Sequence, residues 1–256
     1  MLRQFWIAYL TITRKEIYRF MRIWVQTIIP PVVMVALYFI IFGSLIGQRI
    51  GEMDGMAYMD FIMPGLVMMS IITNSYGNVV SSFYGAKYSR HIEELQVAPV
   101  PNLVIVLGFV TGGLTRGICV GIAVTLVSLL FTEFSVYNPW VVLLVAALTS
   151  CLFALAGLIN AIFANSFDDI TIIPTFVLTP LTYLGGIFYS IRMLPEFWQQ
   201  VSLGNPILYM VNSFRYGFRG SSDIELLTAL GVIGFFIALL FGICMYLLDR
   251  GIGIRQ

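Results

Sequence analysis

The sequence predicts an all-α integral membrane protein, and two observations carry this prediction. Of the 256 residues, 59% are hydrophobic and only 11% are charged, whereas a soluble domain is about half apolar and about a quarter charged. Apolar runs of about 20 residues, the length that crosses a bilayer, also recur along the chain. Because backbone groups in lipid must be paired within their own segment, we expect these runs to be helices.

We expect a single domain over residues 1–256, with an N-terminal interfacial helix in residues 1–22 and a six-span bundle in residues 23–256. An even number of spans places both termini on the same side of the membrane. The predicted spans are Trp24–Ile46, Tyr58–Val80, a helix within Leu103–Phe131, Trp140–Phe163, Ile170–Tyr189 and Leu226–Leu248.

The distribution of Lys and Arg assigns that side, because basic residues are retained on the cytoplasmic face. With the N-terminus inside, nine of them flank the inner ends of the spans and four flank the outer ends. The inner nine are Arg3, Arg14, Lys15, Arg19, Arg22, Lys87, Arg90, Arg250 and Arg255, and the outer four are Arg49, Arg192, Arg215 and Arg219. We therefore expect both termini to be cytoplasmic.

The N-terminal segment Leu2–Arg22 is amphipathic at the period of a helix. Its basic side chains, among them Arg14, Lys15 and Arg19, fall on one arc and its apolar side chains on the other. We expect this helix to lie in the headgroup plane with its apolar face toward the acyl chains. Glu16 lies in the middle of the apolar arc, so it either tilts up to water or meets a basic group of the same protein.

Charged residues gather between spans two and three, in the stretch KYSRHIEELQVAPVP from Lys87 to Pro101. As a helix this stretch has an apolar face, and Arg90 can pair with Glu93 or Glu94. Its prolines would end the helix. Two interpretations remain, a solvated connecting loop or a short amphipathic helix that docks a partner. The predicted apolar face is Tyr88, Ile92 and Leu95, and the candidate docking residues are Lys87, Tyr88, Arg90, His91, Ile92, Glu93, Glu94 and Leu95.

The segment Ser190–Ile224, between spans five and six, is amphipathic, aromatic and broken at Gly204-Asn205-Pro206. It is long for a simple loop. We expect two short re-entrant helices that dip back into the outer leaflet, where protein must shield their non-helical backbone.

Two predicted spans carry stripes of polar residues at positions i, i+4, i+8 and i+11. Such a stripe either lets helices pack closely and hydrogen-bond across the contact or lines a polar conduit. Pro174 and Pro180 would also bend span five. The stripe of span two is Ser70, Asn74, Asn78 and Ser81, and that of span five is Thr171, Thr175, Thr179 and Thr182.

Arg116 is the cation deep within a predicted span. An arginine at a helix centre costs about 2.5–3.5 kcal/mol on the insertion scale, so we expect a partner for it. It serves either as a structural anchor or as a contact for substrate or coupling. Asp168 and Asp169 are expected to cap the fifth helix or to contact a partner protein, and Asp60 is expected to be an interfacial cap.

The stretch His91–Pro101, the opening RKEIYRFMR and the block Leu155–Phe218 resemble ABC-2 type exporter permeases, in particular those of the inner membrane of Gram-negative bacteria. The resemblance covers essentially the whole chain. It implies a dimer of this chain, forming a pathway along spans one, two and five, and two separate ABC ATPase subunits that hold the ATP and Mg²⁺. It also implies that Lys87–Val97 is a cytoplasmic coupling helix that inserts into the ATPase, braced by residues 3–22.

The residues agree that any nucleotide is hydrolysed elsewhere, because no G-x-x-x-x-G-K-[ST] motif is present. The three cysteines lack metal-ligand spacing, and we expect no metal, cofactor or catalytic residue in this chain. A net charge of +1 does not point to nucleic acid, and we expect membrane lipid as the surrounding partner. The alternative is an ion- or proton-coupled secondary transporter, which would want ionisable groups at mid-span, where Arg116 alone stands. The substrate, whether polysaccharide, lipid or drug, stays open.

Overall fold

The computed structural model describes residues 2–47, 51–53, 55–132 and 136–253, and these are mostly helical. The long helices are α1 (Leu2–Arg22), α2 (Trp24–Tyr38) with its π-helical continuation η1 (Phe39–Gly47), α4 (Tyr58–Tyr88), α6 (Asn102–Ser128), α7 (Pro139–Phe163) and α12 (Leu226–Arg250). The shorter helices are α5 (His91–Val97), α8 (Asp169–Ile173), η2 (Pro174–Leu178), α9 (Thr179–Tyr183), η3 (Ile191–Met193), α10 (Glu196–Leu203) and α11 (Pro206–Arg219). Strands β1 (Glu52–Met53) and β2 (Met56–Ala57) pair antiparallel.

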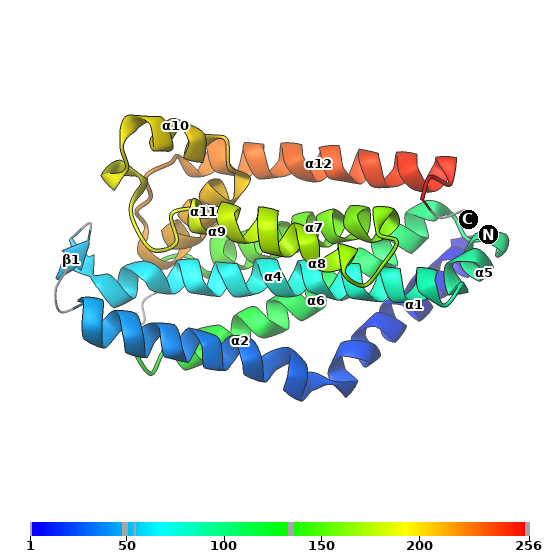
Figure 1. The fold of residues 1–256 in the computed structure, drawn as a ribbon, viewed down its shortest axis with the longest axis horizontal. Helices are drawn as coiled ribbons and strands as arrows, with labels where there is room; N and C mark the ends of the chain where they lie inside the picture. The colour runs from blue at the N-terminus through cyan, green and yellow to red at the C-terminus, as the bar shows by residue number, and fades with distance from the viewer. Residues whose placement is uncertain (1, 48–50, 54, 133–135, 254–256) are drawn as a thin grey trace.

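The long helices run side by side along the long axis of the molecule, as Figure 1 shows. Helix α5, the start of α1 and the end of α12 lie at one end of this bundle, whereas α10, α11 and β1 lie at the other. Helix α1 runs obliquely and meets α2 at a bend. This arrangement has the two ends of the chain on the same side, as an even number of crossings requires.

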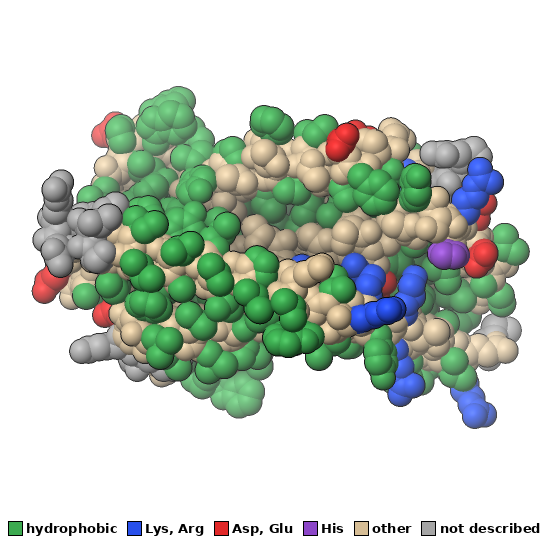
Figure 2. All heavy atoms as spheres, turned by 60° about the horizontal axis from the view of Figure 1, so that its bottom comes forward, with side chains coloured by type: hydrophobic (Ala, Val, Ile, Leu, Met, Phe, Trp, Pro, Cys, Tyr) green, Lys and Arg blue, Asp and Glu red, His purple; other side chains and the backbone are tan. Residues whose placement is uncertain are grey.

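Among the residues that the structure describes, four segments are long and apolar enough to cross a membrane: Trp24–Gly43, Asn102–Ser128, Pro139–Phe163 and Leu226–Arg250. Helices α6 and α7 are central, because 56% of the residues in the apolar stretch of each are buried. Helices α2 and α12 are peripheral, because only 17% and 11% of the residues in their apolar stretches are buried. The centre is α4, whose Ile62, Leu66 and Phe83 are fully buried. Apolar side chains also cover much of the outside of the bundle (Figure 2), which suits a protein surrounded by lipid.

Glycines on α6 let its neighbours approach closely. A Cβ on Gly108 would lie 2.5 Å from Cγ2 of Ile12, and one on Gly112 would lie 2.5 Å from Cβ of Glu16. Since carbon atoms pack at about 3.5–4.0 Å, α1 could not take its place if these two residues were larger. The opposite face of α6 meets α4 in the same way through Gly113, Gly117 and Gly121.

Most predicted spans begin close to where the helices begin, but two boundaries are wrong. Helix α4 continues to Tyr88 instead of ending at Val80, so Lys87 and Tyr88 belong to it and not to the short helix that follows. Span five is not one helix to Tyr189: it ends as α9 at Tyr183 and is interrupted by the π-helical η2. Of the basic residues that assigned the orientation, Arg49 and Arg255 lie outside the described residues.

The segment between α9 and α12, predicted to lie on the outer side, contains the two short helices α10 and α11, separated at Gly204 and Asn205. Asn205 fixes this break, because its Oδ1 accepts a hydrogen bond from the Ile207 amide at 3.0 Å and its Nδ2 donates to the Leu181 carbonyl at 2.6 Å. Helix α11 is largely buried and α10 is largely exposed. Their depth in the outer leaflet stays a prediction.

Candidate functional site

The short helix α5 is reached from α4 through a two-residue turn. Arg90 has φ 61° and is the non-glycine residue with positive φ among those the structure describes. This left-handed conformation reverses the chain so that α5 begins at His91. The helix ends at Val97, because Pro99 forces an extended conformation on Ala98. The structure thus has a short helix, not an irregular loop, between α4 and α6.

The apolar face of α5 packs on its own subunit. Ile92 is 2% exposed and belongs to the hydrophobic core, and Leu95 packs against the same core. The prediction that Tyr88 shares this face is wrong, because Tyr88 is 69% exposed at the end of α4. Ile92 and Leu95 therefore brace α5, and they are poorly placed to contact another protein.

The opposite side of α5 is charged and open. Arg90, His91, Glu93 and Glu94 are all exposed. Among the ion pairs of the described residues, none joins Arg90 to Glu93 or Glu94, so the pairing expected within this helix does not form. These side chains are free to bind a partner.

Lys87 holds α4 against the end of α7. Its Nζ donates to the carbonyl oxygens of Ile162 and Ala164 at 2.7 and 2.8 Å. These carbonyls end α7, where a cation also complements the helix dipole. Beside this contact lies a polar hollow of about 380 Å³, lined by Tyr84, Lys87, Tyr88, Arg90, Glu93, Ala164 and Asn165.

The turn from α7 to α8 is closed by a reciprocal pair of hydrogen bonds. The Ser166 hydroxyl oxygen accepts from the Asp169 amide at 3.1 Å, and the Asp169 carboxylate accepts from the Ser166 amide at 3.2 Å and the Asn165 amide at 2.9 Å. This is a capping box. Asp169 thus caps the start of span five as expected, but the Asp168 side chain makes no capping bond.

Buried polar groups join α1 to α4. Glu16 is fully buried, and the Ser82 hydroxyl donates to its Oε1 at 2.6 Å. Arg19 lies 3.4 Å from the other carboxylate oxygen, and its Nη2 donates to Oδ1 and to the backbone oxygen of Asn78 at 2.7 and 2.8 Å. Of the two interpretations of Glu16, the structure shows the one in which it meets a basic group of the same protein.

Arg116 on α6 extends this cluster one turn further along α4. Its Nη2 donates to Oδ1 of Asn74 at 3.2 Å, so the expected partner is an amide and not an acid. Asn74 and Asn78 are the middle members of the polar stripe of span two, and both are buried. Asn74 and Asn78 therefore make contacts between helices, whereas the hydroxyls of Ser70 and Ser81 bond to carbonyls of α4 itself.

Part of the same stripe also lines a groove between α2 and α4. The groove has a volume of about 360 Å³, and its polar wall consists of Gln26, Thr27, Ser70, Thr73 and Asn74. Pro30 and Pro31 of α2 also line the groove, next to Gln26 and Thr27 on the same helix. Thr73 was not predicted as a lining residue because it lies off the i, i+4 stripe of span two. Gln26 and Thr27 were not predicted because they lie on α2, where the sequence showed no polar stripe.

The stripe of span five does not form one face. Thr171, Thr175 and Thr179 are exposed, whereas Thr182 is buried. The wide turn of η2 changes the register, as the bond from Thr179 Oγ1 to the Pro174 carbonyl five residues earlier shows. Large apolar side chains on the same broken helix are exposed as well, among them Ile172, Phe176, Val177 and Tyr183.

Two arginines hold the outer segment onto α4. Arg219 lies 3.2 Å from Asp60, so Asp60 ends in an ion pair and not in the expected cap. Arg215 is 5% exposed, stacks 3.9 Å above the Phe61 ring and donates to the Gly186 carbonyl at 2.9 Å. The sequence placed Arg215 among the cations that flank the outer ends of the spans without indicating its burial, which its aromatic neighbours in the sequence could have suggested.

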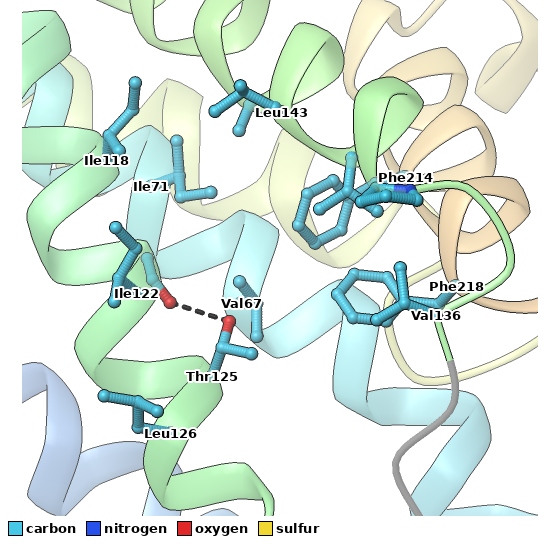
Figure 3. A pocket seen from close by; sticks show the side chains of 14 residues that line it. Val67, Ile71, Ile118, Ile122, Thr125, Leu126, Val136, Leu143, Phe214 and Phe218 are labelled. Carbon is cyan, nitrogen blue, oxygen red and sulfur yellow. Dashed lines mark hydrogen bonds between the residues drawn. The ribbon is translucent and has the colours of Figure 1, made fainter.

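An apolar cavity of about 250 Å³ lies between α4, α6, α7 and α11 (Figure 3). Its walls include Ile71, Ile122 and Phe214, and the hydroxyl of Thr125 is bonded to the Gly121 carbonyl at 2.8 Å. The cavity offers no free polar group among the residues that line it. It therefore has the chemistry of a packing defect or an acyl-chain contact and not of a specific binding site.

The comparisons with known proteins agree with this architecture. Residues 7–218 match the ABC-2 type transporter family. The chain is 58% identical to the inner membrane transport permease YadH of Escherichia coli (strain K12), over all 256 residues and the whole of both chains. It is 24% identical to nodulation protein J of Rhizobium leguminosarum bv. viciae over 213 residues, 81% of each chain. The resemblance identified in the sequence is confirmed, and the chain belongs to the ABC-2 type transporter family.

Proposed function

We propose that this chain is the permease subunit of an ATP-driven exporter in the bacterial inner membrane. In this proposal six spans cross the membrane: the four apolar segments, α4 and the broken helix α8–η2–α9. Two copies form the pathway, and two copies of a separate ABC ATPase dock on the cytoplasmic side and hydrolyse ATP. Membership of the ABC-2 family and the apolar helices support the transporter assignment. The observation that best supports coupling to an ATPase is that α5 packs one face on the core of this chain and exposes a charged face on the other side.

Helix α5 is fixed firmly enough to its own subunit to pass a conformational change from a bound ATPase to the membrane helices. Buried Ile92 anchors it to the core, and its exposed face presents Glu93 and Glu94. The turn before it has only two residues, Ser89 and Arg90, so a displacement of α5 is transmitted directly to α4. Lys87 links the same end of α4 to α7 through two carbonyl bonds.

Two exposed apolar surfaces, on α2 and on the broken helix α8–η2–α9, support a dimer. The broken helix α8–η2–α9 and the outer face of α2 expose large apolar side chains, and the groove with the polar wall lies between α2 and α4. A second copy that covered these surfaces would enclose a conduit with polar walls. Thr171, Thr175 and Thr179 would then lie on the face of the broken helix that a second copy covers.

The side of the membrane follows from the charges. Basic side chains gather at the end of the molecule that carries the termini and α5, as Figure 2 shows. By the positive-inside rule this end is cytoplasmic. Docking of an ATPase to α5 requires this orientation.

Co-purification with the cognate ATPase tests the proposal. The double variant Glu93→Ala/Glu94→Ala removes two exposed acids from α5 without touching Ile92. We expect it to insert normally, to bind the ATPase at least ten-fold more weakly and to lose stimulated ATP turnover. The matched control is Glu196→Ala/Glu225→Ala, two exposed acids at the opposite end of the molecule.

Normal ATPase binding and turnover by the α5 variant would reject the docking role. Transport by the purified permease alone, in liposomes without any ATPase, would instead support an ion- or proton-coupled secondary transporter. The structure gives that alternative little support, because the buried carboxylate of Glu16 is already held by Ser82 and Arg19.

A further inference from the structure

The cluster between α1, α4 and α6 holds more positive than negative charge. Arg19 and Arg116 contribute two positive charges and Glu16 contributes one negative charge, which leaves a net charge of +1. Arg116 takes part in none of the ion pairs that the described residues form. The two guanidinium groups bond to Asn78 and Asn74, which lie one turn apart on α4, so both positive charges belong to one cluster. Burying an unbalanced charge is costly unless a counter-charge binds.

The same cluster has hydrogen-bond donors without acceptors. The bonds from Arg19 to Glu16 and Asn78 all go through its Nη2 atom. Its Nε, the Nε of Arg116 and the Nδ2 of Asn78 are buried with no partner among the residues that the structure describes. Asn78 is fully buried. Three unpaired N–H donors beside an excess positive charge are what an anion would satisfy.

The cluster adjoins the groove between α2 and α4 at Asn74, although Arg19, Arg116 and Asn78 do not themselves line that groove. The Arg19 side chain is 29% exposed, and Arg116 is half-buried. Asn74, which accepts the bond from Arg116, also forms part of the polar wall of that groove. The rest of the groove is apolar, with Met34, Val35 and Leu66 among its walls. A molecule with an anionic head and an apolar tail therefore fits both parts.

We propose that Arg19, Arg116 and Asn78 bind the phosphate-class headgroup of an amphipathic substrate that enters from the inner leaflet. This inference rests on the proposed function and narrows its substrate class. Guanidinium groups form strong charge-assisted bonds with phosphate, and the tail lies in the groove along α2. Neutral and cationic molecules are not ligands of this site.

Binding of dodecyl phosphate to the full-length permease in dodecyl maltoside tests the proposal, with titration calorimetry as the readout. We expect saturable binding by the wild type and none of dodecyl trimethylammonium. Arg116→Gln and Arg19→Gln should each weaken dodecyl phosphate binding at least ten-fold. Arg14→Gln, which removes an exposed positive charge from the same helix α1, should leave it within two-fold.

Asn78→Asp keeps the test decisive if an arginine variant fails to fold. The Nδ2 atom that this change removes has no partner, and the new carboxylate lies where Oδ1 already accepts from Arg19. We expect Asn78→Asp to raise the Tm and to weaken dodecyl phosphate binding at least ten-fold, because it supplies the missing anion internally. A lower Tm with unchanged binding would overturn the proposal, as would the absence of saturable binding by the wild type.

The source of the headgroup is settled by repeating the titration in nanodiscs with and without phosphatidylglycerol. Unchanged dodecyl phosphate binding in phosphatidylglycerol supports a substrate site, whereas full competition overturns the substrate assignment and gives the cluster to bulk lipid. None of these measurements needs the ATPase. The anion site can therefore fail while the co-purification experiment still supports the exporter.

Discussion

The contact between α1 and α6 depends on two glycines, and replacing both with alanine should separate the helices. A Cβ on Gly108 would lie 2.5 Å from Ile12, and one on Gly112 would lie 2.5 Å from Glu16. In both cases the nearest atom is close to the backbone of α1, so a simple side-chain rotation cannot relieve the clash. We predict that Gly108→Ala/Gly112→Ala pushes α1 about 1 Å away from α6, since carbon atoms need about 3.5–4.0 Å.

The loss in the free energy of unfolding can be worked out from the hydrogen bonds between α1 and α4 that break. The displaced helix carries Glu16 and Arg19 away from Ser82 and Asn78, whose bonds measure 2.6–2.8 Å. Hydrogen bonds to charged groups contribute about 1.5–3 kcal/mol each, so losing two costs about 3–6 kcal/mol. Alanine in place of two helical glycines returns about 1–2 kcal/mol. The net destabilisation is about 2–4 kcal/mol, which at about 2–4 °C per kcal/mol for a chain of this size corresponds to a Tm lower by roughly 4–16 °C.

Thermal unfolding of the detergent-solubilised permease measures this difference. The matched control is Gly231→Ala/Gly234→Ala on α12, where a Cβ would meet nothing within 4 Å. The control should keep or slightly raise the Tm. If the α6 variant unfolds within 2 °C of that control, the glycines do not set the approach of α1, and the reasoning is refuted.

Three further changes test how the ends of the bundle are held, each by its Tm. Lys87→Met should lower stability by about 1–3 kcal/mol through two unpaired carbonyls, whereas Lys15→Met, at the other lysine, should have little effect. Asn205→Ala should cost about 1–3 kcal/mol, because a helix cap and a second bond are lost together. Asp60→Asn should cost about 1 kcal/mol at low salt and less in high salt, since its ion pair with Arg219 is partly exposed.

Features that depend on neighbours in the sequence could be predicted from the sequence. Apolar runs and prolines act locally, so the predicted starts at Trp24, Tyr58 and Leu226 coincide with the starts of α2, α4 and α12. The short helix α5 and the break at Gly204-Asn205 were predicted for the same reason. The prolines of span five indicated a bend, but not the wide turn that changes the register of its threonines.

Features that depend on distant partners could not be predicted. Lys87 is paired with carbonyls 75 and 77 residues away, and Ser82 with Glu16 66 residues away. The sequence shows that a buried charge needs a partner but does not name it. The same holds for α5, where an apolar face suggested docking and the structure shows Ile92 packed on its own core.

The two proposed sites are connected by one helix, and this makes the coupling physically simple. Helix α4 ends beside α5, and the same helix carries Asn74 and Asn78 three to four turns earlier. The anion cluster is completed by Arg19 from α1 and Arg116 from α6, so its geometry depends on where α4 stands relative to those two helices. A displacement of α5 that tilts α4 would separate the asparagines from the arginines and release the headgroup. Anion affinity should therefore fall when the ATPase closes on ATP, and dodecyl phosphate should weaken the equilibrium binding of ATP to the closed state by the same factor, because coupling between two sites is reciprocal.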